Sequence, residues 1–289
     1  MIEDRRLLYQ FAQYADKIGH KGPLTTELAV QWAKLPQKAR PMYWASRLDV
    51  VRTFARHMKP LVPETEIPPE RILGPSRRRS TPHIYSDIEI TSILKAARNL
   101  TPVDGLRPHA YVTLFGLLAC TGIRISEALN LTQEDIELHS GIITIREGKG
   151  HTSRLIPLHP TALEALKSYI AKRDKIHPVP KTKSLFVTEK RDSLKYWRVC
   201  NTFREIKISL GWCKINHGPR IYDLRHTFAT RRLLEWYRNG DDVHQKISYL
   251  SHYLGHITIK DTYWYLTAVP ELMAIAASRF EKFANRKER

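Results

Sequence analysis

The 289-residue sequence predicts a mostly α-helical protein with a small antiparallel β-sheet, an α+β fold divided into two domains. Three observations support this prediction. Apolar residues recur at helical spacing along most of the chain, one short segment alternates like a β-hairpin, and a proline-rich stretch separates a small first part from a larger second part. A hydrophobic fraction of 42% beside 26% charged residues is ordinary for globular domains, so each part can bury a core of its own.

Residues 1–62 are predicted to form a small helical domain. Its apolar side chains fall into three groups near helical spacing: Leu7, Leu8 and Phe11; Leu28, Val30 and Trp32; and Leu48, Val51, Phe54 and Ala55. Residues 63–83 then change composition to PETEIPPERILGPSRRRSTPH, in which repeated prolines interrupt any helix. We expect this segment to be a basic linker whose arginines Arg77, Arg78 and Arg79 contact an anionic partner.

Residues 84–289 are predicted to form the larger domain. Ser86 offers an N-cap to a helix that runs to Arg98, and the apolar run AYVTLFGLLAC at 110–120 indicates a buried helix. The segment GIITIREGKGHTSRLIPL alternates around a Gly-Lys-Gly turn and predicts a β-hairpin. Further helices are predicted at 159–173, 194–210, 222–238, 243–254, 258–266 and 271–285.

The charge of the chain narrows the class of partner. There are 47 Lys and Arg residues against 29 Asp and Glu, a formal net charge of +18, and both predicted domains are basic. Such a positive charge favours binding of a polyanion such as nucleic acid. The weaker alternative is that the charge serves only the solubility of the protein.

Membrane association and metal binding are not indicated. The apolar run at 110–120 is far shorter than the roughly 20 residues that span a bilayer, and the opening MIEDRRLLYQ has no apolar signal region. Three cysteines without C-x-x-C spacing suggest neither a disulfide framework nor a zinc site. We therefore expect a cytoplasmic protein without a membrane partner.

Four segments of the larger domain carry side chains that suit phosphate chemistry: TGIRISEAL at 121–129, EGKGHTSRLIPL at 147–158, YDLRHTFATR at 222–231 and LGHITIKDTYWYL at 254–266. Their order and spacing resemble the tyrosine recombinase, or phage integrase, family over residues 84–280. One segment alone would be a weak signal, but four in order are specific. The resemblance implies a helical core-binding, SAM-like domain at 1–62 and a tyrosine-recombinase catalytic domain at 84–289.

The resemblance also implies catalytic roles. It places two arginines at Arg124 and Arg225, a lysine at Lys149, a phosphate-binding histidine at His256 and the tyrosine nucleophile at Tyr265, nine residues after that histidine. Displacement at phosphorus builds negative charge on the non-bridging oxygens, which two guanidinium groups can stabilise. Lys149, at the predicted hairpin tip, would protonate the leaving 5′-oxygen, or would bind phosphate without catalysis. We also expect backbone N–H groups before Arg124 to face the anion.

The third segment departs from the family pattern, because its usual histidine is Tyr222, three residues before Arg225. A phenol with a pKa of about 10 is a poor base at neutral pH but can donate a hydrogen bond, so Tyr222 either serves the site in that way or only packs. His226 is not expected to replace it, because neighbouring helical residues point about 100° apart. Tyr263, close to the nucleophile, is expected to pack.

The function implied by the resemblance is cleavage and rejoining of double-stranded DNA through a 3′-phosphotyrosine intermediate, with no ATP, cofactor or metal. The implied partners are double-stranded DNA, contacted in part by Arg77, Arg78, Arg79 and Lys149, further copies of the chain in a homo-tetramer on DNA, and accessory recombination proteins.

Three alternatives stay open at this point. Tyr222 suggests a DNA-binding protein of the same fold that has lost cleavage, and a type IB topoisomerase shares the phosphotyrosine chemistry but works as a monomer. A helical metalloprotease is suggested only by the four-residue spacing of His252 and His256. Tyr253 stands where the H-E-x-x-H pattern requires glutamate, which weakens this last alternative.

Overall fold

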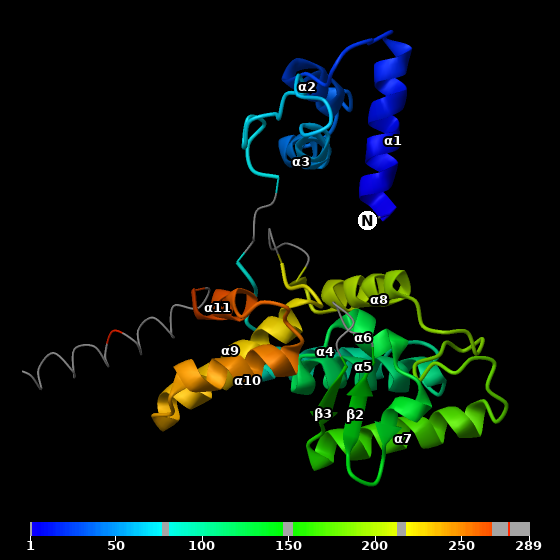
Figure 1. Cartoon of the computed structure of the whole chain (residues 1–289). Helices are drawn as coiled ribbons and strands as arrows, with labels where there is room; N and C mark the ends of the chain where they lie inside the picture. The colour runs from blue at the N-terminus through cyan, green and yellow to red at the C-terminus, as the bar shows by residue number, and fades with distance from the viewer. Residues whose placement is uncertain (1, 77–80, 147–152, 213–217, 268–276, 278–289) are drawn as a thin grey trace, which may run out of the picture. The chain divides into compact units, whose positions relative to one another are not determined.

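The computed structural model describes residues 2–76, 81–146, 153–212, 218–267 and 277. The chain separates into two compact units, Met1–Ser80 and Thr81–Arg289, and each is described by itself (Figure 1). The mostly helical fold with one small antiparallel sheet confirms the fold class predicted from the sequence. Within the described part of the chain, no helix combines the length and the apolar character that crossing a bilayer would need.

The first unit contains three helices: α1 (Ile2–Lys17), α2 (Thr26–Lys34) and α3 (Pro41–Met58). Thr25 caps α2 by accepting a hydrogen bond from the amide of Leu28 at 3.2 Å. The helices share a core in which Phe11 meets Trp32 edge to face, with 5.3 Å between ring centres. Helical spacing in the sequence indicated this core, although Phe54 lies on the exposed side of α3.

The second unit is built mainly from helices. They are α4 (Asp87–Arg98), α5 (Leu106–Thr121), α6 (Ile125–Asn130), α7 (Pro160–Ile176), α8 (Tyr196–Ser209), α9 (Asp223–Asn239), α10 (Val243–Leu254) and α11 (Lys260–Thr267), with a 3₁₀ turn, η1, at Gln133–Asp135. Ser86 and Glu89 form a capping box at the start of α4, so the predicted N-cap is present. The helix predicted at 271–285 lies almost entirely outside the described residues.

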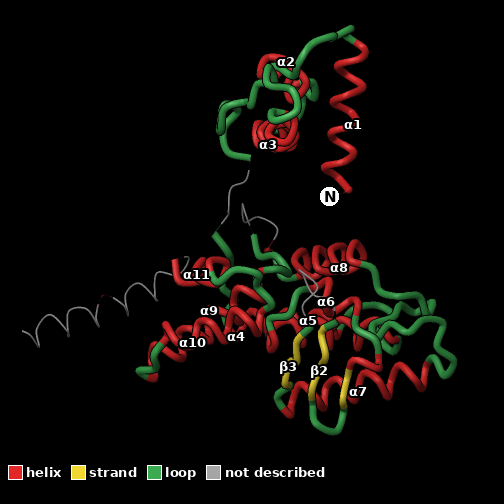
Figure 2. The backbone as a smooth tube through the Cα atoms, in the orientation of Figure 1, coloured by secondary structure: helices red, strands yellow, loops and turns green. Residues whose placement is uncertain are grey.

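The predicted hairpin is present, and a third strand joins it. β1 (Ile136–Glu137), β2 (Ile142–Ile145) and β3 (Arg154–Pro157) form an antiparallel sheet in the order β1-β2-β3, beside α7 in Figure 2. In the β2–β3 pair Ile143 lies opposite Ile156 and both are buried, whereas Leu155 is exposed. Because side chains alternate along a strand, Arg154 shares the buried face with Ile156.

Two hydrophobic clusters organise the second unit, and α9 contributes to both. The larger cluster joins α4 to α8 with the sheet and includes Leu224 at the start of α9. The smaller one joins α9, α10 and α11 and includes Ala229, Leu233 and Tyr265. Arg225 therefore lies on α9 at the junction of the two cores, where packing on both sides limits its movement.

Candidate functional site

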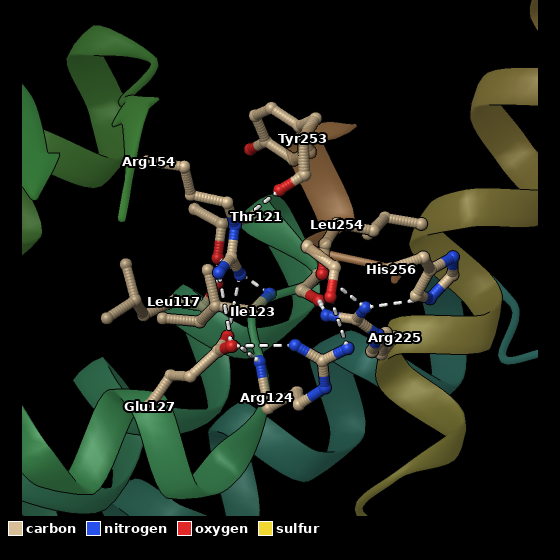
Figure 3. A network of polar contacts seen from close by, with 12 residues as sticks. Leu117, Thr121, Ile123, Arg124, Glu127, Arg154, Arg225, Tyr253, Leu254 and His256 are labelled. Carbon is tan, nitrogen blue, oxygen red and sulfur yellow. Dashed lines mark hydrogen bonds and ion pairs between the residues drawn. The ribbon is translucent and has the colours of Figure 1, made fainter. Parts of the chain in front are cut away.

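Four residues singled out from the sequence lie together in the second unit, although they come from separate elements. Arg124 is the N-cap of α6, Arg225 lies in the first turn of α9, His256 follows α10 and Tyr265 lies near the end of α11. Both arginines bond to the turn at 254–256, as Figure 3 shows, and the ring of Tyr265 packs on His256.

Arg225 is deeply buried, with 2% of its surface exposed. Its Nη1 donates to the carbonyl of Gly122 at 2.8 Å, and its Nη2 donates to the carbonyl of Leu254 at 2.6 Å. Burial lowers the pKa of this guanidinium, and the neighbouring Tyr265 opposes that effect. Within the described chain, the buried Nε has no hydrogen-bond partner, so one donor of this guanidinium is left unsatisfied.

The turn before Arg124 contacts Arg225 through the carbonyl of Gly122 rather than offering its N–H groups to the site. The amide of Gly122 donates to the carbonyl of Leu118 at 3.0 Å, inside the end of α5, while its own carbonyl accepts from Arg225. The expectation that these N–H groups face an anion is therefore wrong for Gly122, because the helix end uses them. The turn positions the guanidinium that would bind the anion.

Two glycines allow these turns to approach the arginines. Gly122 ends α5 and Gly255 ends α10, each with a left-handed φ of +64°. A Cβ at Gly122 would lie 2.5 Å from Cδ1 of Phe228, and one at Gly255 would lie 2.7 Å from Nη1 of Arg154. Both the backbone conformation and the lack of space therefore favour glycine.

Arg124 is held by Glu127, a residue that the sequence analysis did not single out. The Arg124 amide and Nη1 each donate to the Glu127 carboxylate at 2.8 Å, and Nη2 donates to the carbonyl of Gly255 at 2.7 Å. The Arg124 side chain keeps 18% of its surface exposed, so it can still reach a ligand. Glu127 stands three residues after the N-cap and accepts from the N-cap amide, as in one half of a capping box, and a glutamate at this position is the signal that could have identified it.

Arg154 is the second residue that sequence reasoning missed. From the buried face of β3 it donates to both Glu127 oxygens, at 3.1 and 2.7 Å, and its Nε donates to the carbonyl of Tyr253 at 2.6 Å. Burial alone would raise the pKa of Glu127, but hydrogen bonds from Arg154 and from Arg124 outweigh it and lower that pKa. Glu127 is therefore ionised at neutral pH.

His256 lies between Arg225 and α11. Its Nε2 is 3.0 Å from Nη2 of Arg225, and its Nδ1 is 2.7 Å from Oγ1 of Thr262, which is fully buried. Burial, together with the charges of Arg225 and Arg124, lowers the pKa of His256 to about 4. The imidazole is therefore neutral at physiological pH.

Tyr265 has 2% of its surface exposed and belongs to the smaller core. Its ring stacks on that of His256, with 5.9 Å between centres and 18° between planes. Burial raises the pKa of the phenol although Arg225 opposes the rise, so Tyr265 holds its proton at neutral pH. Tyr263 is 36% exposed and does not belong to this core.

His226 shares a helix face with Tyr222 and lies against Tyr265. The rings of Tyr222 and His226 meet edge to face at 5.0 Å, because residues four apart share one helix face, and His226 also meets the ring of Tyr265 edge to face at 5.0 Å. The expectation that His226 does not replace Tyr222 in the site stays a prediction. Tyr222 itself is 49% exposed, and His226 is buried beneath it.

The remaining predicted residues, Lys149 and Arg77, Arg78 and Arg79, lie outside the described residues. The described strands β2 and β3 lead into and out of the segment that contains Lys149.

Comparison with known proteins identifies the family. Residues 86–271 match the model described as the phage integrase family. An inferred integrase/recombinase of Sinorhizobium fredii, y4rB, is 38% identical over 289 residues, covering 97% of this chain and 91% of that protein. The tyrosine recombinase XerD of Bradyrhizobium diazoefficiens is 27% identical, covering 92% and 85%.

Solved structures share the fold. The XerH site-specific recombinase in a post-cleavage complex with palindromic difH substrate superposes with a TM-score of 0.69 at 19% identity, covering 95% of this chain and 78% of that one. The Tn1549 transposon integrase in complex with transposon right end DNA gives 0.67 at 16% identity, covering 97% and 92%. With a family match over more than half of its length, this chain belongs to the phage integrase family, the tyrosine recombinases, and this membership supports a role in site-specific recombination.

Proposed function

We propose that this protein is a recombinase that cleaves and rejoins double-stranded DNA through a 3′-phosphotyrosine link to Tyr265. One observation carries the proposal: Arg124, Arg225 and His256 converge beside the ring of Tyr265. Guanidinium donors held in place before the reaction stabilise the charge that develops on phosphate oxygens in the transition state. The buried Nε of Arg225, without a partner in the described chain, supports a role of this kind.

In the proposed cleavage step the phenol oxygen of Tyr265 attacks the scissile phosphorus. A bond forms between that oxygen and phosphorus, the bond to the 5′-oxygen breaks, and the phenol proton passes to a nearby base or to water. The leaving 5′-oxygen takes a proton, which we assign to Lys149. Rejoining reverses these transfers, and the phosphotyrosine conserves the bond energy, so no ATP is consumed.

The other predicted residues take supporting roles in this proposal. Arg124 and Arg225 hold the non-bridging oxygens, and Tyr222 donates a hydrogen bond to the phosphate from its exposed position. Residues 1–62 act as a second DNA-binding domain, joined by the basic linker at 63–83, whose Arg77, Arg78 and Arg79 contact the DNA backbone. The net charge of +18 makes this binding depend on salt.

Strand exchange between two DNA sites requires four cleavages. We therefore propose that four copies of the chain assemble on two sites, with accessory proteins that set direction. Such an assembly separates the proposal from a type IB topoisomerase, which would relax supercoiled DNA as a monomer without pairing two sites.

Covalent capture tests the proposal. Wild-type protein is incubated with a nicked duplex taken from the DNA that flanks its gene, so that the short 5′ fragment diffuses away after attack and rejoining is blocked. We expect a protein–DNA adduct on a denaturing gel, unaffected by chelator. Specific binding without any adduct would instead identify a DNA-binding protein that has lost cleavage, and a monomer that relaxes supercoiled DNA without pairing sites would identify a topoisomerase.

A further inference from the structure

The Glu127 carboxylate is shared by two guanidinium groups, as Figure 3 shows. Arg124 approaches it from α6 and Arg154 from β3, at the distances given above. The side chains of Glu127 and Arg154 are only 7% and 3% exposed, whereas Arg124 is 18% exposed. Arg154 is thus the inner cation of this trio, and Arg124 is the outer one that a ligand can reach.

The charges of these three side chains decide how strongly Arg124 can attract a phosphate. A lone carboxylate paired with Arg124 would offset the positive charge of that guanidinium at the place where an anion must bind, and burial strengthens such interactions. Glu127 holds its charge at neutral pH, as the lowered pKa indicates. Arg154 adds a second positive charge to the same carboxylate, so the three groups together remain cationic.

Arg154 also touches the turn on which both proposed phosphate-binding arginines depend. Its Nε donates to the carbonyl of Tyr253, and its Nη1 lies 2.7 Å from the place where a Cβ on Gly255 would be. The carbonyl of Gly255 in turn accepts from Arg124. One buried side chain therefore connects β3, Glu127 and the turn that precedes His256.

We propose that Arg154 is a positioning residue for recombination, which balances the charge of Glu127 and so leaves the charge of Arg124 available to the scissile phosphate. Arg154 does not touch the DNA itself; it acts through Glu127 and Arg124. The inference rests on the function proposed above.

The test separates charge from packing with three variants. Arg154→Met removes the charge but keeps an unbranched side chain, Arg154→Lys keeps the charge without the planar fork, and Arg154→Met with Glu127→Gln removes both charges. Arg146→Met is the matched control, because Arg146 follows β2 in the same hairpin and pairs with Asp135 at 2.6 Å, but its side chain is 64% exposed. Single-turnover cleavage of the nicked duplex is measured at saturating protein, with DNA affinity and thermal unfolding measured separately.

We expect Arg154→Met to lose on the order of 100-fold in cleavage rate, similar to the loss of one transition-state donor, while DNA affinity changes much less. Arg154→Lys should keep most of that rate, and adding Glu127→Gln to Arg154→Met should recover at least roughly tenfold, because it removes the uncompensated carboxylate. Arg146→Met should cleave like wild type.

Several results would overturn the inference. If Arg154→Lys is as slow as Arg154→Met, or if Glu127→Gln slows Arg154→Met further, then shape rather than charge matters and Arg154 is only a packing residue. A wild-type cleavage rate for Arg154→Met would also show that the charge of Arg154 does not matter for cleavage. If Arg154→Met does not fold, the rate of Arg154→Lys relative to wild type decides instead: a rate close to wild type supports the role of charge, and a loss on the order of 100-fold supports shape. Failure of wild-type protein to form any adduct would instead overturn the proposed function, and this inference with it.

Discussion

The buried guanidinium of Arg225 donates a hydrogen bond to the imidazole of His256, with 3.0 Å between Nη2 and Nε2. Because arginine has only donors, Nε2 must accept, and the ring proton of a neutral His256 therefore lies on Nδ1, where it can be donated to Thr262. Both ring nitrogens are thus engaged within the protein. For His256 to donate to a scissile phosphate, as the family resemblance implies, DNA binding has to change one of these two contacts.

The lowered pKa of His256 predicts how the stability of the protein depends on pH. Its pKa of about 4 in the folded protein lies below the usual 6.5, so the unfolded chain takes up the proton first. The stabilising contribution of neutral His256 is therefore fully present above pH 6.5 and is progressively lost as the pH falls toward 4. His256→Gln should flatten that part of the pH dependence of the free energy of unfolding. An NMR titration of the His256 ring with a midpoint near 6.5 would contradict the prediction.

Arg124→Ala and Arg225→Ala should each slow cleavage by about 10²- to 10³-fold, because they remove donors needed most in the transition state. DNA affinity should fall far less. The two variants should differ in stability: Arg225→Ala leaves the buried carbonyls of Gly122 and Leu254 without their donors, at about 1–3 kcal/mol for each buried group left unsatisfied. Chemical denaturation, DNA binding and single-turnover cleavage measure the three effects. Equal losses of binding and cleavage would make these arginines affinity residues.

Local signals in the sequence were sufficient for much of the fold. The Ser86 cap and the alternation around β2 and β3 depend on neighbouring residues, so they could be predicted. The partnership of Glu127 and Arg154 could not, because these residues are 27 positions apart and meet only after β3 packs against α6 and the α10 turn. The contact between His226 and Tyr222 was not anticipated for a different reason: the angle to Arg225 was considered, while the four-residue spacing from Tyr222 was not.

Tyr222→Phe tests how much the departure from the family pattern matters. One hydrogen bond contributes about 1 kcal/mol, so we expect a loss in cleavage rate of less than roughly tenfold if the phenol only donates to the phosphate. Tyr222→His restores the usual family residue at an exposed helix start and should keep activity. Both variants should fold like wild type, which thermal unfolding checks. Complete loss of cleavage in Tyr222→Phe would show that the hydroxyl has an essential role.

Tyr265→Phe should abolish covalent capture of DNA while fold and DNA affinity are retained. The substitution removes one oxygen from a side chain that is 2% exposed in the smaller core, and the phenyl ring keeps its packing against His256. Tyr263→Phe is the matched control, because Tyr263 lies on the same helix but is 36% exposed and outside that core. We expect Tyr263→Phe to form adduct at close to the wild-type rate. The nicked duplex, a denaturing gel and peptide mapping by mass spectrometry measure both variants together. An adduct that maps to Tyr263, or one that persists in Tyr265→Phe, would show that the buried phenol is a core residue and that the nucleophile lies elsewhere.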